Sequence, residues 1–571
     1  MIDEERLIEL LNKTAKLLEF VDENKFKILA YSNGAEIIES YDGKFFELYN
    51  SGAYKNVKGI GKGLQEFIKE FAETNSVLIY EQLLDKAPVG IFDMLKIKGL
   101  GLKKIKNIYE SLNIQTFEQL EQACISGKIL EVKGITEKFV KDILEEINRI
   151  KKDRNKLLLS KALLMAENLI NYLIVNPLII KVETVGQLCR NMEVISKSEI
   201  IVYLNTDANF IDIIKNKYVV TSVSSFEKYE EYELLVGSSN HITVYLCNSI
   251  ERYNYTKFVK TGSTQFLEKY FGGLDAENFQ NENDYFNSHN LTFLNYEVRE
   301  VEALPYINKL ELNSNLTKEN IKGLIHFHTT YSDGIATPEE MIAESVINGL
   351  IYNVISDHSK SAFYANGLNE DRLLKQREHI NRLTKTDGTY IFQGIESDII
   401  ADGNLDYDNT ILKELDFVIA SVHSRFDMSK EEMTNRIIKA IENPYTDVIG
   451  HVTGRVLLRR KPYELDIYKI LDACVQNDVA IEINSAPSRL DLDWRNIYYA
   501  REKGCKFCIN PDAHATSEIQ VIQYGVKIAR KGGIQINDVI NCFDVDDFIS
   551  YINRKVTRKF NRRQYGIERI N

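Results

Sequence analysis

The feature that most constrains the fold of this chain is a series of seven short apolar runs between residues 323 and 514. A polar residue capable of binding metal or accepting a hydrogen bond stands where each run ends. The runs are GLIHFH (323–328), YNVISDH (352–358), YIFQGIE (390–396), DFVIASVH (416–423), DVIGH (447–451), VAIEIN (479–484) and KFCINPDAH (506–514). Amphipathic helical stretches such as PEEMIAESVINGL (338–350) separate most of them. Strands that alternate with helices predict a parallel sheet, and seven such units predict a closed (β/α)7 barrel.

The residues at these strand ends are expected to meet, because barrel enzymes carry their chemistry where the strands end. The candidate metal ligands and catalytic residues are His326, His328, Asp333, His358, Glu396, His423, His451, Asp512 and His514. Mixed imidazole and carboxylate ligation suits Mn²⁺, Zn²⁺ or Fe²⁺. Nine ligands exceed the needs of one ion, so we expect two or three divalent ions. Such a cluster would activate water and neutralise the charge of a phosphoester.

Three glycine turns lie between helical segments in the N-terminal part of the chain. They are VKGIGKG (57–63), IKGLGL (97–102) and VKGIT (132–136), and an amphipathic segment follows each. Such a turn exposes backbone N–H groups at the start of a helix, where a phosphate can bind without any contact to a base. These segments resemble helix-hairpin-helix DNA-binding motifs. The residues expected to contact the DNA backbone are Gly59, Gly61, Gly63, Gly99, Gly101, Lys103 and Lys104.

The middle of the chain has strand-like runs such as EIIVYLN (199–205) and HITVYLC (241–247). Its position after the glycine turns resembles a family X DNA polymerase, and Gly186, Arg190 and Glu193 match the frame of that family's nucleotidyltransferase motif. Lys197 and Glu199 stand where the family has two aspartates, and the third aspartate position matches Tyr245. Two-metal nucleotidyl transfer needs carboxylates that hold both ions. We therefore expect a polymerase-shaped core that does not polymerise.

The C-terminal region resembles the polymerase and histidinol phosphatase (PHP) domain found in bacterial family X polymerases. The matching motifs are HFHTTYSDG, SDHS, GIESDI, LDFVIASVHS, GHVTGR, EINSAPSRLDL and NPDAH. The resemblance places all nine metal-ligand types of the family at the nine positions named above, and it implies manganese. It also implies 3′→5′ exonuclease activity, with abasic-site and 3′-end processing. Arg455, in GHVTGR, is a candidate contact for a substrate phosphate.

The sequence thus predicts a multidomain chain with a helical N-terminal region, an α+β middle and a C-terminal barrel. The expected domains are a helical DNA-binding domain with a helix-hairpin-helix (1–85), a second, fingers-like helix-hairpin-helix domain (86–154), a degenerate palm-like domain (155–235), a thumb-like domain (236–315) and a PHP phosphoesterase domain (316–571).

Charge and composition set the expected location and partners. The formal net charge is −12, so nucleic-acid binding would depend on local basic patches. The acidic N-terminus MIDEER lacks the profile of a secretory signal, and Lys161 and Glu167 interrupt the most apolar stretch, 157–182. We expect a cytoplasmic monomer with no membrane partner, acting on gapped or 3′-end-containing duplex DNA.

The function predicted from these observations is a DNA-binding, metal-dependent phosphodiesterase that processes 3′ ends or abasic sites in repair. Three alternatives stay open. The first is an active gap-filling polymerase that uses Glu199 with another carboxylate, such as Asp207 or Asp212. The second is a DNA-binding scaffold without catalysis, and the third is a small-molecule phosphatase of the histidinol phosphate type.

Overall fold

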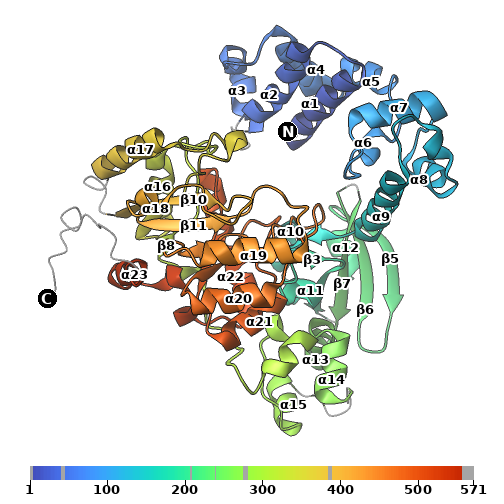
Figure 1. Ribbon diagram of the computed structural model, residues 1–571. Coiled ribbons are helices and arrows are strands. Elements are labelled where there is room, and N and C mark those ends of the chain that lie inside the picture. The colour runs from blue at the N-terminus through green and yellow to red at the C-terminus, as the bar shows by residue number, and fades with distance from the viewer. Residues whose placement is uncertain are drawn as a thin grey trace. The chain divides into compact units, whose positions relative to one another are not determined.

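A computed structural model describes residues 4–39, 45–205, 209–237, 239–273, 279, 281–383 and 389–555. The chain divides into two compact units, Met1–Asn155 and Lys156–Asn571 (Figure 1). No helix among the described residues is long and apolar enough to cross a membrane.

The described part of the first unit consists of helices and turns around one apolar core that includes Leu11, Phe67, Ile105 and Ile143. Its elements are α1 (Glu4–Phe20), α2 (Lys25–Glu39), α3 (Phe45–Ser51), η1 (Ala53–Asn56), α4 (Lys62–Thr74), α5 (Leu78–Leu84), α6 (Ile91–Met94), α7 (Leu102–Leu112), α8 (Phe117–Ile125), η2 (Lys128–Glu131) and α9 (Glu137–Asp153).

Each glycine turn leads into a helix, as predicted. The first glycine of each turn is left-handed, with φ of 96° at Gly59, 84° at Gly99 and 87° at Gly134. Gly61 and Gly101 are the N-caps of α4 and α7. The third turn has Thr136 as the N-cap of α9, and its side chain accepts a hydrogen bond from the N–H of Phe139. Threonine thus supplies a side-chain cap where the other two turns have glycine.

The second unit begins with a mixed sheet of five strands in the order β2-β4-β7-β6-β5. A helix, α10 (Leu159–Ile174), and the sheet share an apolar core. The sheet runs past residue 235, where the palm-like domain was expected to end, because β7 pairs with both β4 and β6. The elements are β1 (Leu157–Leu158), β2 (Ile179–Val185), α11 (Gly186–Cys189), β3 (Val194–Ile195), β4 (Ser198–Leu204), α12 (Phe210–Ile214), β5 (Val219–Ser225), β6 (Glu230–Val236) and β7 (Asn240–Cys247).

The helices after this sheet share a core with the C-terminal barrel. Phe258 and Phe286 belong to the same buried cluster as Leu324 and Phe507 in the barrel strands. The elements of this stretch are α13 (Ile250–Thr261), α14 (Thr264–Phe271), α15 (Glu282–Ser288), η3 (Tyr296–Val298), η4 (Val301–Tyr306) and η5 (Lys318–Asn320).

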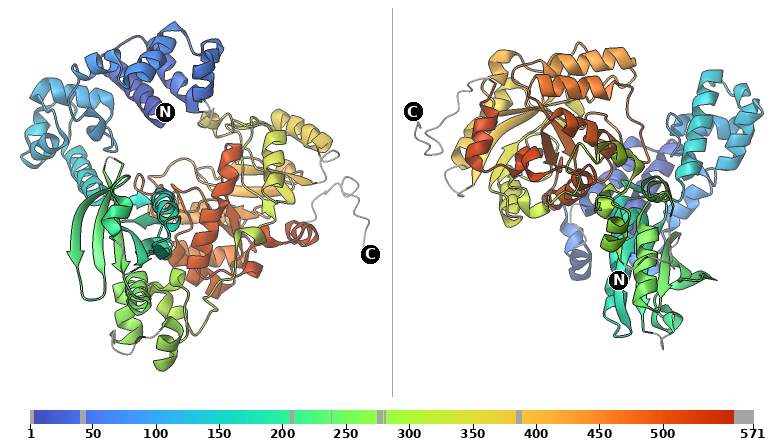
Figure 2. Two further views of the ribbon diagram at one scale, coloured as in Figure 1. Left: turned by 180° about the vertical axis from the view of Figure 1, so that it is seen from behind. Right: turned by 90° about the horizontal axis from the view of Figure 1, so that it is seen from below.

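The C-terminal region is a nearly closed parallel barrel, as predicted. Its seven strands pair in chain order from β8 to β14. Beyond the two end strands, Phe327 and Ala513 form a parallel backbone bridge that brings the edges together. Helices lie around the strands (Figures 1 and 2). The strands are β8 (Gly323–Leu324), β9 (Tyr352–Ile355), β10 (Tyr390–Asp398), β11 (Phe417–Ser421), β12 (Val448–Ile449), β13 (Ala480–Asn484) and β14 (Phe507–Asn510).

The segments between and after these strands are mostly helical. They comprise α16 (Pro338–Ile347), η6 (Phe363–Ala365), α17 (Glu370–Leu383), α18 (Asn409–Leu412), α19 (Lys430–Ile441), α20 (Ile467–Gln476), α21 (Trp494–Lys503), η7 (Thr516–Val521), α22 (Ile522–Lys531), η8 (Ile536–Asp538), η9 (Ile540–Cys542) and α23 (Val545–Ile552).

Alternation along the strands separates two apolar cores. In β11, Phe417 and Ile419 belong to the inner cluster, whereas Val418 and Ala420 face the surrounding helices. Residues of α23 join the inner cluster, and the ring of Phe548 stacks on that of Tyr352 with 4.5 Å between centroids. One end of the barrel is therefore filled with apolar side chains, and the polar strand ends lie at the other.

A buried polar network joins the palm-like region to the barrel. Glu193 accepts hydrogen bonds of 2.8 Å from Trp494 Nε1 and from Arg495 Nη1. Close by, Glu300 Oε1 accepts from Arg190 Nε at 2.8 Å and from Lys531 Nζ at 3.0 Å. The matched polymerase-motif residues Arg190 and Glu193 thus both take part in contacts that hold the two regions together.

We expect Glu300→Gln to destabilise the second unit by about 3 kcal/mol, because it leaves two buried cations without their carboxylate. Urea unfolding followed by tryptophan emission measures this directly, since Trp494 is the one tryptophan in the sequence and lies at this contact. Glu302→Gln is the control, because the Glu302 side chain is 39% exposed. Equal unfolding midpoints for the two variants would show that the network does not stabilise the contact.

Candidate metal centre

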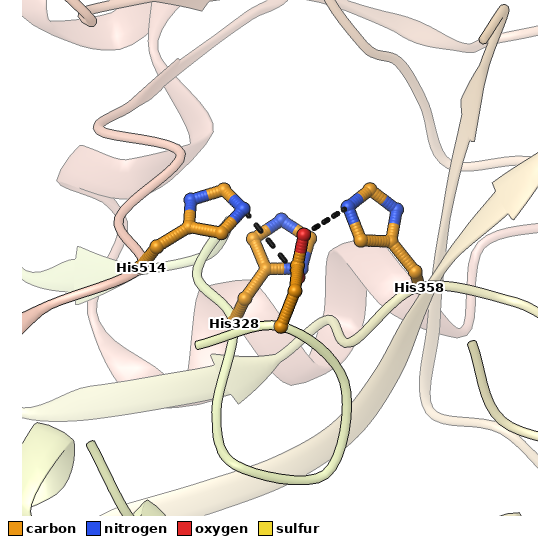
Figure 3. A group of neighbouring side chains, drawn as sticks. His328, His358 and His514 are labelled. Atoms are coloured by element: carbon orange, nitrogen blue, oxygen red, sulfur yellow. Dashed lines mark ion pairs between the residues drawn. The ribbon is translucent and has the colours of Figure 1, made fainter. Parts of the chain in front are cut away.

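The structure brings the nine residues predicted at the strand ends into one cluster. Three groups have side-chain donor atoms within 4.8 Å of one another: His328, Asp333, His358 and His514; His326, His328 and Asp512; and His358, Glu396 and His423. His328 and His358 each belong to two groups, so the groups are continuous. Figure 3 shows the imidazoles of His328, His358 and His514 turned toward one another.

Glu396 lies at the centre of the cluster and is fully buried. Its carboxylate oxygens lie 2.9 Å from His358 Nδ1, 3.0 Å from His451 Nε2, 3.3 Å from His423 Nε2, 3.5 Å from His326 Nε2 and 3.6 Å from His328 Nε2. Asp512 Oδ1 lies 3.2 Å from His328 Nε2 and 3.4 Å from His326 Nε2. Ligands about 2.1 Å from a shared ion lie at comparable separations.

Several buried nitrogen and oxygen atoms of the cluster make no hydrogen bond of suitable geometry among the described residues, although oppositely charged groups lie close to them. These atoms are His326 Nε2, His328 Nδ1, His358 Nδ1, Glu396 Oε2 and His451 Nδ1. An unpaired buried polar atom is costly, so several in one place call for a ligand. Lone pairs of imidazole and carboxylate at this spacing fit divalent cations, and the residues present therefore fit the metal cluster that the sequence predicts.

The orientation of two imidazoles is set by carboxylates outside the nine. Glu482 Oε1 accepts from His326 Nδ1 at 2.6 Å, and Asp398 Oδ1 accepts from His423 Nδ1. Glu482 also accepts from the N–H of His451 at 2.7 Å. A carboxylate in this position fixes the ring and raises the basicity of its free nitrogen. The sequence analysis missed Glu482, although an acidic residue between two isoleucines of a buried strand is a usable signal.

The buried imidazoles and carboxylates of the cluster shift one another's pKa values. Burial would lower the pKa of His326, but Glu482, Asp512 and Glu396 raise it well above its ordinary value. Burial would raise the pKa of Glu396, but His423, His326 and other imidazoles hold it well below its ordinary value. Burial, with His358 and His514, lowers the pKa of His328 to about 3. The carboxylates are therefore ionised, and His328 keeps a free nitrogen lone pair.

The loop that carries Asp333 is fixed by a buried aspartate. Asp357 accepts from the N–H of Thr329 at 2.7 Å, from Ser332 Oγ at 2.5 Å and from Gln376 Nε2 at 2.6 Å. The Asp333 and His514 side chains are 32% and 35% exposed, far more than those of His326 and His328. The cluster therefore reaches solvent on the side of Asp333 and His514.

Arg455, a predicted contact for a substrate phosphate, has a buried guanidinium. It donates to Asp493 Oδ2 at 2.7 Å and to the carbonyls of Arg489 and Leu490. These contacts hold the 489–493 loop in place, and the phosphate role of Arg455 stays a prediction. That loop carries Arg489, whose Nε lies 3.7 Å from Asp512 Oδ2, and the sequence analysis did not single it out.

The residues at the polymerase-like positions contact one another and form no cluster of imidazoles and carboxylates like that in the barrel. Tyr245 donates to Glu199 Oε1 at 2.6 Å, and Lys197 Nζ lies 3.2 Å from the Tyr245 hydroxyl and 3.9 Å from Glu199. Gly186 has φ of 64°, and a Cβ there would lie 1.9 Å from Glu199 Oε2. Within the described residues, the three groups of possible metal ligands all come from residues 326–514. Glu199 belongs to none of them.

The two other carboxylates considered for a polymerase site give no support. Asp207 lies outside the described residues. Asp212, in α12, pairs at 2.8 Å with Lys215, the residue that follows this helix, and both side chains are more than half exposed.

The glycine turns of the first unit are open on one side. A Cβ at Gly61, Gly63, Gly99 or Gly101 would meet no described atom within 4 Å. Of these four, only Gly99 has a positive φ. Neither close packing nor a left-handed backbone therefore explains why the other three positions hold glycine. Lys103 is exposed in the first turn of α7. Lys104 Nζ donates to the Gly99 carbonyl at 3.1 Å and lies 4.0 Å from the centre of the Phe139 ring.

Family models match three stretches of the chain. A helix-hairpin-helix domain matches residues 3–77, a SAM-like helix-hairpin-helix tandem matches residues 91–149 and a PHP domain matches residues 325–486. The two helical matches contain all three glycine turns.

Individual proteins give matches of different extent. The DNA polymerase/3′-5′ exonuclease PolX of Bacillus subtilis (strain 168) is 30% identical over 570 residues, which is 96% of this chain and 99% of that protein. A probable phosphatase of Thermoanaerobacter sp. (strain X514) is 35% identical over 182 residues, or 30% of this chain and 71% of that protein. The crystal structure of histidinol phosphate phosphatase from Lactococcus lactis, complexed with zinc, L-histidinol and phosphate, is 20% identical with a TM-score of 0.30. It covers 38% of this chain and 95% of that one.

We expect Glu482→Gln to weaken metal binding about 10- to 100-fold, because the amide cannot accept from both His326 and the N–H of His451. Retained metal, measured by mass spectrometry after dialysis against graded chelator, gives this change. Glu464→Gln is the matched control, since Glu464 is exposed in the same barrel. Equal retention by wild type and Glu482→Gln would contradict the orienting role.

Proposed function

Because the chain belongs to the family X DNA polymerases that carry helix-hairpin-helix and PHP domains, we propose that its barrel hydrolyses DNA from the 3′ end. The observation that carries this proposal is the contrast between its two candidate centres. Eight of the nine predicted ligand residues, the buried Glu396 among them, form the three groups of possible metal ligands, and His451 lies 3.0 Å from Glu396. The polymerase-like positions instead hold Lys197, Glu199 and Tyr245, and the lysine lies within 3.9 Å of Glu199, Glu231 and Glu233.

The reaction consumes one water for each nucleotide removed. Water attacks the phosphorus of the last phosphodiester, and the bond from phosphorus to the preceding O3′ breaks. The shortened strand keeps a 3′-hydroxyl, and the product is a nucleoside 5′-monophosphate. We propose that the nine residues hold two or three divalent ions, with Mn²⁺ favoured over Zn²⁺ or Fe²⁺. When bound, such ions supply Lewis acidity toward the phosphoryl oxygens and lower the pKa of water.

In this proposal the chain's own residues do the positioning. Glu482 and Asp398 hold the rings of His326 and His423, so that the opposite nitrogens face Glu396. Arg489 lies near Asp512 at the edge of the cluster, where a guanidinium can pair with a phosphate oxygen. The same site would process blocked 3′ ends or abasic residues in repair.

We also propose that the palm-like region does not polymerise. The Lys197 ammonium lies among Glu199, Glu231 and Tyr245, in the place where a polymerase of this family needs cations held by aspartates. An ammonium already neutralises these carboxylates, which leaves little for a divalent ion. The buried contacts of Arg190 and Glu193 support a structural role for this region.

The helix-hairpin-helix turns would hold the DNA backbone. Gly61, Gly63 and Gly101 leave the helix N-termini open, so a phosphate can approach the N–H groups closely. We propose the division at residues 85, 154 and 315 for the domains, with the palm-like sheet extended to Cys247. We also propose a monomer acting in the cytoplasm.

A phosphatase activity toward small monoesters is the second candidate function. The probable phosphatase of Thermoanaerobacter matches 182 residues, or 30% of this chain. The N-terminal helix-hairpin-helix domains favour DNA over such a substrate, because a small monoester would not contact them.

The first prediction from this proposal concerns a 5′-labelled duplex with a single-nucleotide gap, incubated with Mn²⁺. We expect wild type to shorten the labelled strand stepwise from its 3′ end and His326→Ala to leave it intact, because His326 takes part in the buried cluster. Denaturing gel electrophoresis gives the product ladder. His379→Ala is the control, since His379 pairs with Glu339 outside the nine residues.

Two results would count against the proposal. Strand extension in the presence of deoxynucleotides, lost in Glu199→Ala but kept in His326→Ala, would restore the polymerase. Fast hydrolysis of a small phosphomonoester with the DNA untouched would favour the phosphatase.

A second prediction concerns Lys103, which is exposed beside the open turn at Gly101. Lys103→Ala should reduce the slope of log affinity against log salt by about one, because one phosphate contact is lost. Fluorescence anisotropy with duplex DNA at several salt concentrations measures the slope. Lys69→Ala is the control, because Lys69 lies in α4 and pairs with Glu73. An unchanged slope for Lys103→Ala would remove this turn from the DNA interface.

A further inference from the structure

Two large aromatic side chains stand exposed beside the metal centre. Phe363 and Tyr364 are 89% and 72% exposed, although the residues on either side of them, Ala362 and Ala365, are buried. The ring centroid of Tyr364 lies 6.2 Å from that of His358, one of the nine cluster residues. Tyr364 is therefore next to the candidate reaction centre, and Phe363 is its neighbour in the chain. Because both side chains are exposed, packing in the protein interior does not account for them.

The loop that carries these rings is fixed at both ends. The N–H of Ser359 donates to the carbonyl of Glu396 at 3.0 Å, and the N–H of Leu368 donates to the carbonyl of His358 at 2.8 Å. Ser361 donates through both its N–H and its hydroxyl to Asp406. A Cβ at Gly367 would lie 1.9 Å from the Ser359 carbonyl oxygen, which keeps the loop closed tightly on itself.

The far side of the loop is fixed as well. Asn366 has φ of 53° and donates through Nδ2 to the carbonyl of Ser332 at 3.2 Å. Arg372 Nη1 donates to the carbonyl of Asn366 at 2.7 Å. The rings are thus presented by a supported backbone, and little conformational freedom is lost when a ligand stacks on them.

The charges around Tyr364 indicate which ligand these rings suit. The Tyr364 ring lies beside His358, whose Nδ1 is 2.9 Å from the Glu396 carboxylate, and the Arg489 guanidinium lies beside Asp512 in the same cluster. A ligand here must combine a flat apolar face with a phosphate, and a nucleotide at the end of a strand has both.

We propose that Phe363 and Tyr364 form a stacking platform for the unpaired base of the 3′-terminal nucleotide. The inference rests on the proposed function, because it assigns the base whose phosphodiester the barrel would cleave. Stacking of a base on an aromatic side chain does not depend on its identity, so the platform favours any unpaired 3′ end over a fully paired one.

The test uses two single-stranded oligonucleotides that are identical except at the 3′ end, where one carries thymidine and the other a tetrahydrofuran abasic residue. Wild type with Mn²⁺ should remove the thymidine nucleotide roughly tenfold faster, as expected for one stacked base. In the double variant Phe363→Ala with Tyr364→Ala, this ratio should fall to about one, while the rate on the abasic end stays unchanged. A ratio that stays near ten in the double variant would overturn the platform.

Conservative variants and a surface control make the result specific. Tyr364→Phe and Phe363→Tyr keep a flat ring and should keep the ratio. Ile347→Ala removes a 77% exposed apolar side chain at the end of α16 and should change nothing. Loss of the ratio in either ring-preserving variant would contradict stacking. Trp494 emission shows whether each variant is folded.

A binding measurement separates this inference from the proposed function. A single strand ending in 2-aminopurine loses fluorescence when that base stacks, and without added divalent ions no cleavage competes. Quenching by wild type that is lost in the double variant supports the platform, even where no strand is cleaved and the exonuclease proposal fails. Equal quenching by wild type and the double variant overturns the platform, whatever the cleavage result.

Discussion

The buried carboxylate of Glu396 requires positive charge around it, and the polar end of the barrel is arranged to meet this requirement. It lies within 3.6 Å of five imidazoles, inside a fold whose other end is filled with apolar side chains. A group of this kind is stable in the interior only when cations or protonated partners surround it. The carboxylates Glu482 and Asp398 hold two of the imidazoles in turn. The polar end of the barrel is therefore built to hold positive charge, and its strands end where that charge is needed.

The palm-like region contacts the barrel through a residue of its matched motif. Glu193 binds Trp494 and Arg495 at the start of α21. The loop just before α21 carries Arg489, whose Nε lies 3.7 Å from Asp512 Oδ2 in the metal centre. Glu193 therefore supports the helix that follows the loop bordering this centre, which gives the matched glutamate a structural role of its own.

Much of the fold and of the site follows from local sequence. The strand-end residues were predictable because each run is apolar, has the length of a strand and is followed by a residue type that binds metal. Glu482 was missed because the sequence does not show which face of its strand the side chain lies on. Its partners, His326 and His451, are evident only once the strand alternation is known. The buried contacts of Arg455 were not predicted because a sequence shows a charge but not the acceptors that surround it in the fold. The exposure of Phe363 and Tyr364 likewise depends on a loop closed by distant residues, which no local pattern encodes.

The apolar filling by α23 has a consequence for how a polymer can use this barrel. With Phe548 stacked on Tyr352 in the inner core, the ring of strands is a cup with a floor and not a tunnel. Among the described residues, the cluster is open to solvent on the side of Asp333 and His514, whose side chains are 32% and 35% exposed. A polymer can therefore present its end to such a cup, whereas apolar side chains fill the path through the ring of strands.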